Sequence, residues 1–288
     1  MSSETSGSIW RWERTPDGVW TLWFDQPGRS QNVLDPAALD ELETHLVEAE
    51  GEFALQSLVI RSAKPKGFCA GVDLRTILSC GTSADVETFV RRGLAVFDRL
   101  SGFAVPTVAV IHGVCFGGGL ELALACRRRI ALASAAPLQI GTPDIHLGLI
   151  PGWGGIDRLP RLIGPDDGVD LLISGRLIGY LLARSHGLVD RLAAEGDLEE
   201  AVELIGSSAV PERTWPREAW ESAWSRVHAQ VEEQPGDHPE AQLKILTIVA
   251  IDQAHGRDAA REGIAPALAE LAMTDVVRDS VGAFLQNE

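Results

Sequence analysis

The chain lacks the features that mark membrane, secreted and nucleic-acid-binding proteins. Its 288 residues hold 25 Lys and Arg against 41 Asp and Glu, and a net charge of −16 argues against an extended basic face for nucleic acid. No apolar run approaches the roughly 20 residues of a membrane helix. The N-terminus has neither the basic nor the apolar region of a signal peptide. We therefore expect a cytoplasmic protein without a nucleic-acid or membrane partner.

Cysteine is scarce. The four residues, Cys69, Cys80, Cys115 and Cys126, show no C-x-x-C spacing and no neighbouring histidine cluster. This spacing argues against a disulfide framework or a zinc site, and free thiols suit a reducing compartment. The composition, 45% hydrophobic and 23% charged, is that of a globular protein long enough for one large domain or a domain with an appendage.

Strand, turn and helix patterns recur along the first two thirds of the chain. Hydrophobic periodicity and turn residues predict a strand pair at 8–26, buried strands at 57–61, 107–111 and 130–135, and helices at 35–50, 84–101 and 119–126. Helices are expected in the remainder at 217–233, 239–255 and 257–285. We predict an α/β core over residues 1–206 and a helical C-terminal assembly region over residues 207–288.

Two segments share a pattern in which a buried strand leads to a glycine-containing turn: residues 67–74 (GFCAGVDL) and residues 112–121 (HGVCFGGGLE). Glycine lets a ligand approach the main chain closely, and the second run also opens an apolar helix with unpaired N–H groups. Two N–H groups aimed at one point would stabilise a thioester oxyanion by roughly 3–4 kcal/mol per donor. One such turn alone would more often be a plain connection.

A third segment, residues 141–155 (GTPDIHLGLIPGWGG), supplies Asp144, and Glu121 closes the second glycine segment. Either acid alone would be unremarkable, for example as a helix cap. Two carboxylates beside an oxyanion site suit general acid/base chemistry, such as addition of water across a conjugated double bond.

These three segments, in this order, resemble the crotonase (enoyl-CoA hydratase/isomerase) superfamily over essentially the whole chain. Residues 26–35 (QPGRSQNVLD), residues 158–164 (RLPRLIG) and, more weakly, the stretch around Phe284 and Leu285 most resemble the hydratase portion of the multifunctional fatty-acid oxidation α-subunit. No G-x-G-x-x-G of the dehydrogenase portion follows before Glu288, so we expect a stand-alone relative or a piece of a longer protein.

The resemblance implies a fold and an assembly. The fold is an α/β crotonase-type ββα spiral with a helical C-terminal region. The expected assembly is a homotrimer or a dimer of trimers.

The resemblance also implies roles for individual residues. Val72 and Gly118 match the oxyanion N–H donors, Glu121 matches the first catalytic glutamate, and Asp144 occupies the place of the second. The implied reaction is reversible hydration of a 2-trans-enoyl-CoA to the 3-hydroxyacyl-CoA. Coenzyme A is then part of the acyl-CoA thioester substrate, and neither a metal nor a separate cofactor is implied.

Three further residues are implied to contact the substrate. Arg75 falls where the family often has a basic residue near the coenzyme A phosphates, and Ala70 would line the adenine and pantetheine path. Trp153 lies among glycines that border the acyl pocket and would narrow it. A core tryptophan would give the same pattern, so both readings of Trp153 stay open.

The chain departs from the hydratase pattern in two places. The stretch between Glu121 and Asp144 is a few residues longer, which predicts a surface insertion at 133–137. Hydratases have glutamate where this chain has Asp144, which retracts the carboxylate by about 1.5 Å, and misplacement by about 1 Å can cost on the order of 100-fold in rate. His146 is an alternative base, although a packing role is commoner. Gly152 argues against the dienoyl-CoA isomerase and thioester-hydrolase branches.

Other reactions therefore stay open. A Δ3-Δ2 enoyl-CoA isomerase and an acyl-CoA decarboxylase need the oxyanion site but can work with one acid. A non-catalytic homologue that only binds acyl-CoA or a partner protein is a third reading.

Overall fold

A computed structural model describes residues 7–133, 136–207 and 213–287. A six-stranded sheet forms its first layer, in the order β1-β2-β3-β5-β7-β9, with β1 antiparallel to β2 and the other neighbours parallel. Every residue of β5 is buried, as expected for a parallel strand covered on both faces. The strands are β1 (Trp10–Arg14), β2 (Val19–Phe24), β3 (Ser57–Ser62), β5 (Thr107–Ile111), β7 (Arg128–Leu132) and β9 (Arg191–Ala193).

A second, smaller sheet positions the three segments singled out in the sequence. It consists of three short parallel strands, β4 (Gly67–Cys69), β6 (Val114–Phe116) and β8 (Gln139–Gly141), in that order. The carboxyl ends of parallel strands lie at one edge of a sheet, which is where ligand sites form in α/β proteins. The residues that follow these strands therefore meet at that edge.

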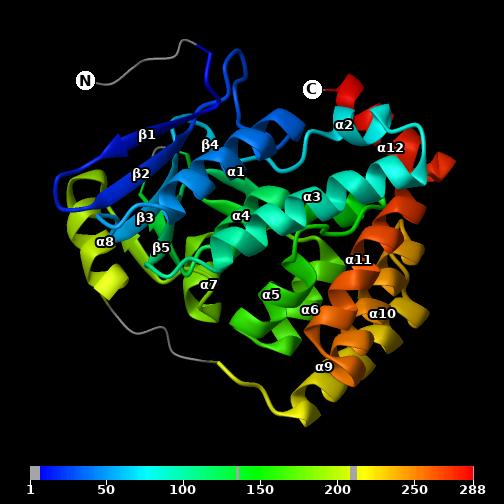
Figure 1. Ribbon diagram of the computed structural model, residues 1–288. Helices are drawn as coiled ribbons and strands as arrows, with labels where there is room; N and C mark the ends of the chain where they lie inside the picture. Colours follow the sequence, from blue (N-terminus) through cyan, green and yellow to red (C-terminus); the bar gives the residue numbers. More distant parts are fainter. Residues whose placement is uncertain (1–6, 134–135, 208–212, 288) are drawn as a thin grey trace.

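Helices cover both sheets, and their starts follow from the sequence. The carboxylate of Asp35 caps α1 by accepting from the Ala38 N–H at 2.8 Å, and Thr82 with Asp85 forms a capping box at the start of α3. Figure 1 shows α1 and α3 running side by side. The helices of this part are α1 (Pro36–Glu50), α2 (Leu74–Ser79), α3 (Ser83–Ser101), α4 (Gly118–Ala125), α5 (Gly155–Ile163), α6 (Pro165–Ser174), α7 (Tyr180–His186), α8 (Leu198–Ser207) and the 3-10 turns η1 (Pro143–Leu147) and η2 (Glu195–Asp197).

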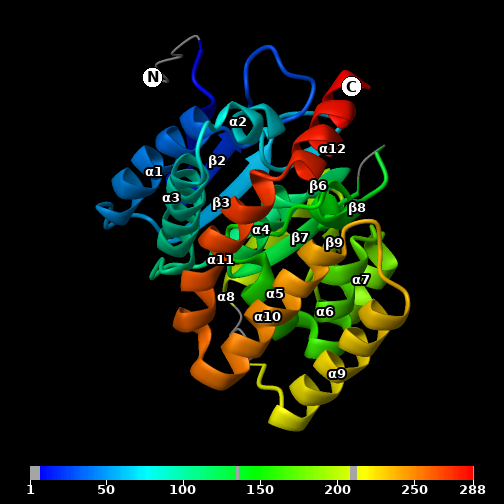
Figure 2. The same ribbon diagram turned by 90° about the vertical axis from the view of Figure 1, so that its right-hand side faces the viewer.

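Four helices form the C-terminal part: α9 (Arg217–Glu233), α10 (Pro239–His255), α11 (Arg257–Ala272) and α12 (Asp275–Gln286). They pack onto the same chain, α9 against α6 and α11 against α3 and α10 (Figures 1 and 2). Helix α12 lies beside α2, where Arg278 donates to the Leu78 carbonyl at 2.8 Å. Buried residues of these helices belong to the main hydrophobic core.

Most predicted elements are present, with two differences. The strand predicted at 130–135 lies two residues earlier, and residues 134–135 of the predicted insertion are outside the described residues. The prediction of one helix over 257–285 is wrong, because the helix ends at Ala272 and a second one begins at Asp275. The Thr274 side chain caps this second helix by accepting from the Val277 N–H.

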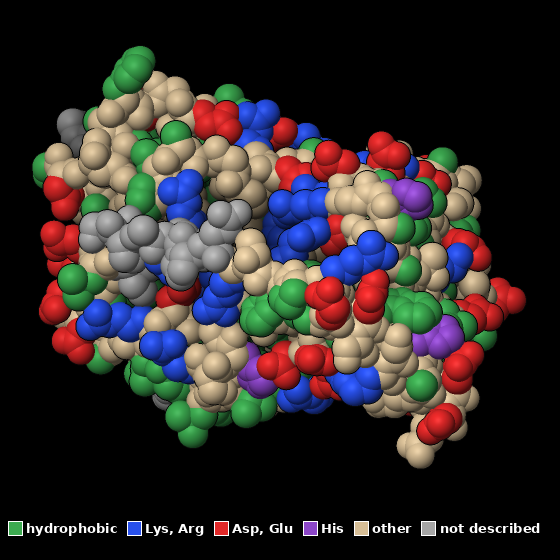
Figure 3. Space-filling model, turned by 90° about the horizontal axis from the view of Figure 1, so that it is seen from below, with side chains coloured by type: hydrophobic (Ala, Val, Ile, Leu, Met, Phe, Trp, Pro, Cys, Tyr) green, Lys and Arg blue, Asp and Glu red, His purple; other side chains and the backbone are tan. Residues whose placement is uncertain are grey.

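Among the described residues, no helix is long and apolar enough to cross a membrane, and no group of His, Cys, Asp and Glu is arranged to hold a metal ion. All four cysteines are free thiols. On the face seen from below in Figure 3, Lys and Arg side chains lie among Asp and Glu side chains.

Candidate active site

A small cavity and a large groove meet at the edge of the second sheet. The cavity has a volume of about 30 Å³ and is lined by Glu121, Trp153 and apolar side chains. The groove has a volume of about 790 Å³ and runs along the outside of the glycine turns. Val72 and Asp144 line both spaces, so the two communicate at these residues.

The backbone amides of Val72 and Gly118 lie close together at this junction. A Cβ built on Gly118 would lie 3.4 Å from the Val72 nitrogen, and a Cβ built on Gly71 would lie 3.5 Å from the Gly118 nitrogen. Leu34 bonds to the residues on either side of Val72, and neither amide N–H has an acceptor among the described residues. Gly118 begins α4, where the first N–H groups of a helix are unpaired. This pair of donors can bind one oxyanion.

Glu121 lies in the first turn of α4 with 2% of its surface exposed. Its Oε1 accepts two backbone hydrogen bonds of 2.7 Å, from the N–H groups of Trp153 and Gly155. Burial, followed by the nearby charge of Asp144, raises the pKa of Glu121 to about 8, although the two N–H groups and Arg158 oppose the rise. Near neutral pH this carboxyl group is mostly protonated and can donate a proton from Oε2.

Asp144 lies on η1 with its carboxylate packed against the backbone of Gly117. A Cβ on Gly117 would lie 2.6 Å from Asp144 Oδ1, so a side chain there would displace the carboxylate, and the φ of +46° also favours glycine. Burial raises the pKa of Asp144 to about 6, and its Oδ2 has no hydrogen-bond partner among the described residues.

The two carboxyl groups therefore differ in protonation near neutral pH. Asp144, with a pKa of about 6, is mostly ionised, whereas Glu121, with a pKa of about 8, is mostly protonated. Two acids with separated pKa values at one site can act as a base and an acid in the same reaction. His146, the alternative base, lines the groove instead.

The groove carries the predicted binding residues and two cations that the sequence analysis missed. Ala70 and Arg75 both line it, as do Arg29 and Lys66. Arg29 pairs with Asp73 at 2.6 Å, which holds its guanidinium beside the Val72 turn. A groove with three basic side chains can receive an anionic group such as a phosphate. The local pattern around Arg29 does not reveal this role, because the contact spans 44 residues.

The C-terminal helices complete both spaces. Leu268 of α11 lines the cavity, and Phe284 and Leu285 of α12 line the groove. The sequence pattern indicated only a packing or assembly role for this part of the chain. Its amphipathic helices give no sign that individual residues reach the site.

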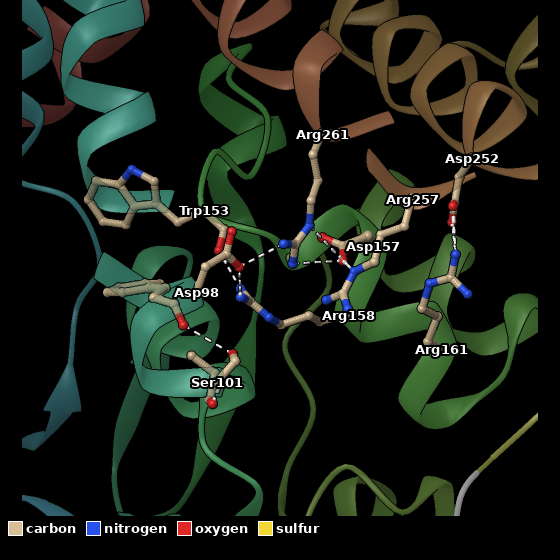
Figure 4. Close-up of polar contacts among 12 residues, drawn as sticks. Asp98, Ser101, Trp153, Asp157, Arg158, Arg161, Asp252, Arg257 and Arg261 are labelled. Atoms are coloured by element: carbon tan, nitrogen blue, oxygen red, sulfur yellow. Dashed lines mark hydrogen bonds and ion pairs between the residues drawn. The ribbon is translucent and has the colours of Figure 1, made fainter. Parts of the chain in front are cut away.

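A partly buried ion cluster supports the loop that holds Glu121 (Figure 4). Arg158 donates to the carbonyl oxygen of Trp153 at 2.7 Å and to Asp98 at 2.6 Å. Arg261 of α11 bonds to Asp98 and Asp157, and Arg257 pairs with Asp157 at 2.5 Å. The cluster holds the Trp153 carbonyl, which lies between the Trp153 and Gly155 N–H groups that bind Glu121, so the C-terminal helices also help to position the acid.

Glu121 should make the stability of the protein depend on pH. Its carboxyl ionises near pH 4.5 in the unfolded chain but only near pH 8 in the folded chain. The burial of a protonated Glu121 therefore makes its full contribution to the free energy of unfolding below about pH 4.5. This contribution decreases as the pH rises above 4.5 and is lost by about pH 8. In Glu121→Gln the amide oxygen can keep both N–H bonds without ionising. We expect this variant to melt above the wild type at about pH 9 and to differ little at about pH 5.

Scanning calorimetry of both proteins across this range measures the effect. The same difference in melting temperature at both pH values would contradict the raised pKa of Glu121.

Comparison with known proteins gives the family. The Enoyl-CoA hydratase/isomerase family profile matches residues 14–250. The fatty acid oxidation complex subunit alpha of Shewanella amazonensis is 40% identical over 66% of this chain, and that of Idiomarina loihiensis is 33% identical over 90%. The matched regions span 27% and 38% of the lengths of these relatives.

Solved structures show the same fold. The enoyl-CoA hydratase of Bacillus halodurans has a TM-score of 0.69 at 21% identity, covering 96% of this chain and 100% of that one. The enoyl-CoA hydratase of Bacillus anthracis has a TM-score of 0.63 at 25% identity, covering 98% of this chain and 97% of that one. The predicted crotonase-type α/β fold with a helical C-terminal region is confirmed. The chain belongs to the enoyl-CoA hydratase/isomerase family.

Proposed function

We propose that the protein catalyses the reversible hydration of a 2-trans-enoyl-CoA to the 3-hydroxyacyl-CoA. The observation that carries this proposal is the pairing of a mostly protonated Glu121 with a mostly ionised Asp144 in one cavity beside two unpaired amides. Hydration of a conjugated double bond needs all three parts: a base for water, an acid for the α-carbon and donors for the enolate oxygen.

In the proposed mechanism the thioester carbonyl accepts the N–H groups of Val72 and Gly118. Asp144 takes a proton from water as the water oxygen bonds to C3, and the electrons of the double bond move to form the enolate. Glu121 then gives its proton to C2. Exchange of protons with solvent restores an ionised Asp144 and a protonated Glu121.

The groove supports a coenzyme A thioester as the substrate. Arg29, Lys66 and Arg75 would bind the phosphates, and Ala70 would lie along the pantetheine path. The two carboxyl groups and two amides supply the whole chemistry, so the proposal calls for no metal or redox cofactor. We also propose a homotrimer or a dimer of trimers, which sedimentation of the purified protein would test.

Crotonyl-CoA tests the reaction directly. We expect the purified protein to remove the ultraviolet absorbance of the enoyl thioester and to form 3-hydroxybutyryl-CoA. We also expect millimolar acetyl-CoA to raise the melting temperature, because only the folded protein has the site. A thermal shift without turnover would indicate a binding protein. Absence of both effects would contradict any acyl-CoA function.

A further inference from the structure

Trp153 forms one wall of the small cavity beside the catalytic groups. Its side chain is 3% exposed, and a Cβ built on Gly118 would lie 2.7 Å from Cζ3 of the indole. The six-membered ring therefore packs against the residue whose amide belongs to the oxyanion pair. In Figure 4 the indole points away from the arginine cluster, while the carbonyl of the same residue is held by Arg158.

The surroundings fix the indole in this place. Phe89 and Phe97 of α3 contact its ring edge-to-face at centroid distances of 5.5 and 5.4 Å. Gly93 lies between them, and a Cβ there would be 2.3 Å from the indole Nε1. Glycine is a poor helix former, so its presence within a 19-residue helix is explained by the room it leaves for the indole. Trp153 therefore cannot turn toward α3 to enlarge the cavity.

The cavity that remains is small. Its volume is about 30 Å³, and Val90, Ile150 and Leu268 line it on the side away from the groove together with Trp153. One water-sized group needs about 10–15 Å³ of such volume, so the space holds roughly two or three groups of that size. With the thioester carbonyl at the two amides, these positions suffice for C2, C3 and one further carbon.

We propose that Trp153 restricts the acyl group to about four carbons and is the specificity-determining residue of this site. The inference rests on the proposed acyl-CoA function but not on hydration as the reaction. Short acyl groups bury their whole length between the catalytic groups and the indole. Longer acyl groups contact the indole ring of Trp153 and do not fit in the cavity.

Binding of saturated thioesters tests the proposal without turnover. Titration calorimetry compares butyryl-CoA, decanoyl-CoA and coenzyme A for the wild type, Trp153→Leu and Trp20→Leu. Trp20 is another buried tryptophan, on the six-stranded sheet, and serves as the matched control. The wild type should bind decanoyl-CoA no tighter than butyryl-CoA. Trp153→Leu should shift the ratio of the two affinities toward decanoyl-CoA by at least about tenfold, and Trp20→Leu should leave it unchanged.

Two outcomes would overturn the proposal: wild-type protein that binds decanoyl-CoA about tenfold tighter than butyryl-CoA, or an unchanged ratio in folded Trp153→Leu. If the leucine variant does not fold, Trp153→Phe takes its place with a smaller shift in the same direction. Gly93→Ala, which pushes the indole toward the cavity, should weaken butyryl-CoA binding. Failure of the wild type to hydrate crotonyl-CoA would refute the proposed reaction and leave these binding results unaffected.

Discussion

Replacement of Glu121 by glutamine, or of Asp144 by asparagine, is expected to lower kcat for crotonyl-CoA hydration by on the order of 10²–10⁴-fold. Each change removes one proton-transfer group and keeps the size of the side chain. Acyl-CoA binding should be largely retained, because the basic groove residues Arg29, Lys66 and Arg75 are untouched. Stopped-flow or steady-state absorbance assays measure the loss, and Glu221→Gln on the exposed face of α9 is the matched control with unchanged activity.

The pH dependence of hydratase activity should show which carboxyl group acts as the base and which as the acid. Activity should rise with pH through about 6, where Asp144 ionises, and fall through about 8, where Glu121 loses its proton. The two values belong to the interacting pair. If Asp144→Asn kept full hydratase activity while Glu121→Gln lost it, the two-acid mechanism would be wrong. A one-acid reaction such as Δ3-Δ2 isomerisation would then be the better reading, and a 3-enoyl-CoA would be the substrate to test.

Arg158→Met is expected to destabilise the protein by about 1–3 kcal/mol, the cost of leaving a buried acceptor without its donor. Arg158 is 7% exposed, so its loss removes the side-chain donor to the Trp153 carbonyl and one of the two arginines that bind Asp98. Its charge also lowers the pKa of Glu121, so the high-pH limb of activity should move to higher pH in the variant. Urea unfolding and a pH–rate profile measure the two effects.

Arg217→Met provides the control for this change. Arg217 pairs with Glu221 on α9, and its side chain is 81% exposed. An exposed ion pair of this kind contributes only about 0.2–1 kcal/mol. Equal losses of stability in the two variants would show that the Arg158 contacts contribute no more to the free energy of unfolding than an exposed ion pair does.

That the three glycine-containing segments lie together could be predicted from the sequence, because each follows a short strand. Gly67–Cys69, Val114–Phe116 and Gln139–Gly141 are parallel neighbours, so the turns after them meet at one edge. That Asp144 and Glu121 share a cavity follows from this arrangement. Their separate pKa values do not, because burial and the two N–H bonds to Glu121 arise only from the packed structure.

The residues that complete the site could not be predicted, because their contacts join distant parts of the chain. Leu268 reaches the cavity from a helix whose pattern indicates only packing. Gly93 has no turn or motif around it, and its role depends on an indole 60 residues further along the chain. Periodicity locates elements, but it does not say which face of one element meets which residue of another.

During synthesis, Asp157 leaves the ribosome well before Arg257 and Arg261, the two arginines that pair with it. These partners are separated by 100 and 104 residues. At about 5–20 residues per second, the acid emerges roughly 5–20 s before either arginine. During that interval the cavity lacks the side that Leu268 forms, and the two arginines of α11 are not present to neutralise Asp157. Under the proposed function the site is complete only once α11 has docked, so a chain truncated before Arg257 is expected to lack activity.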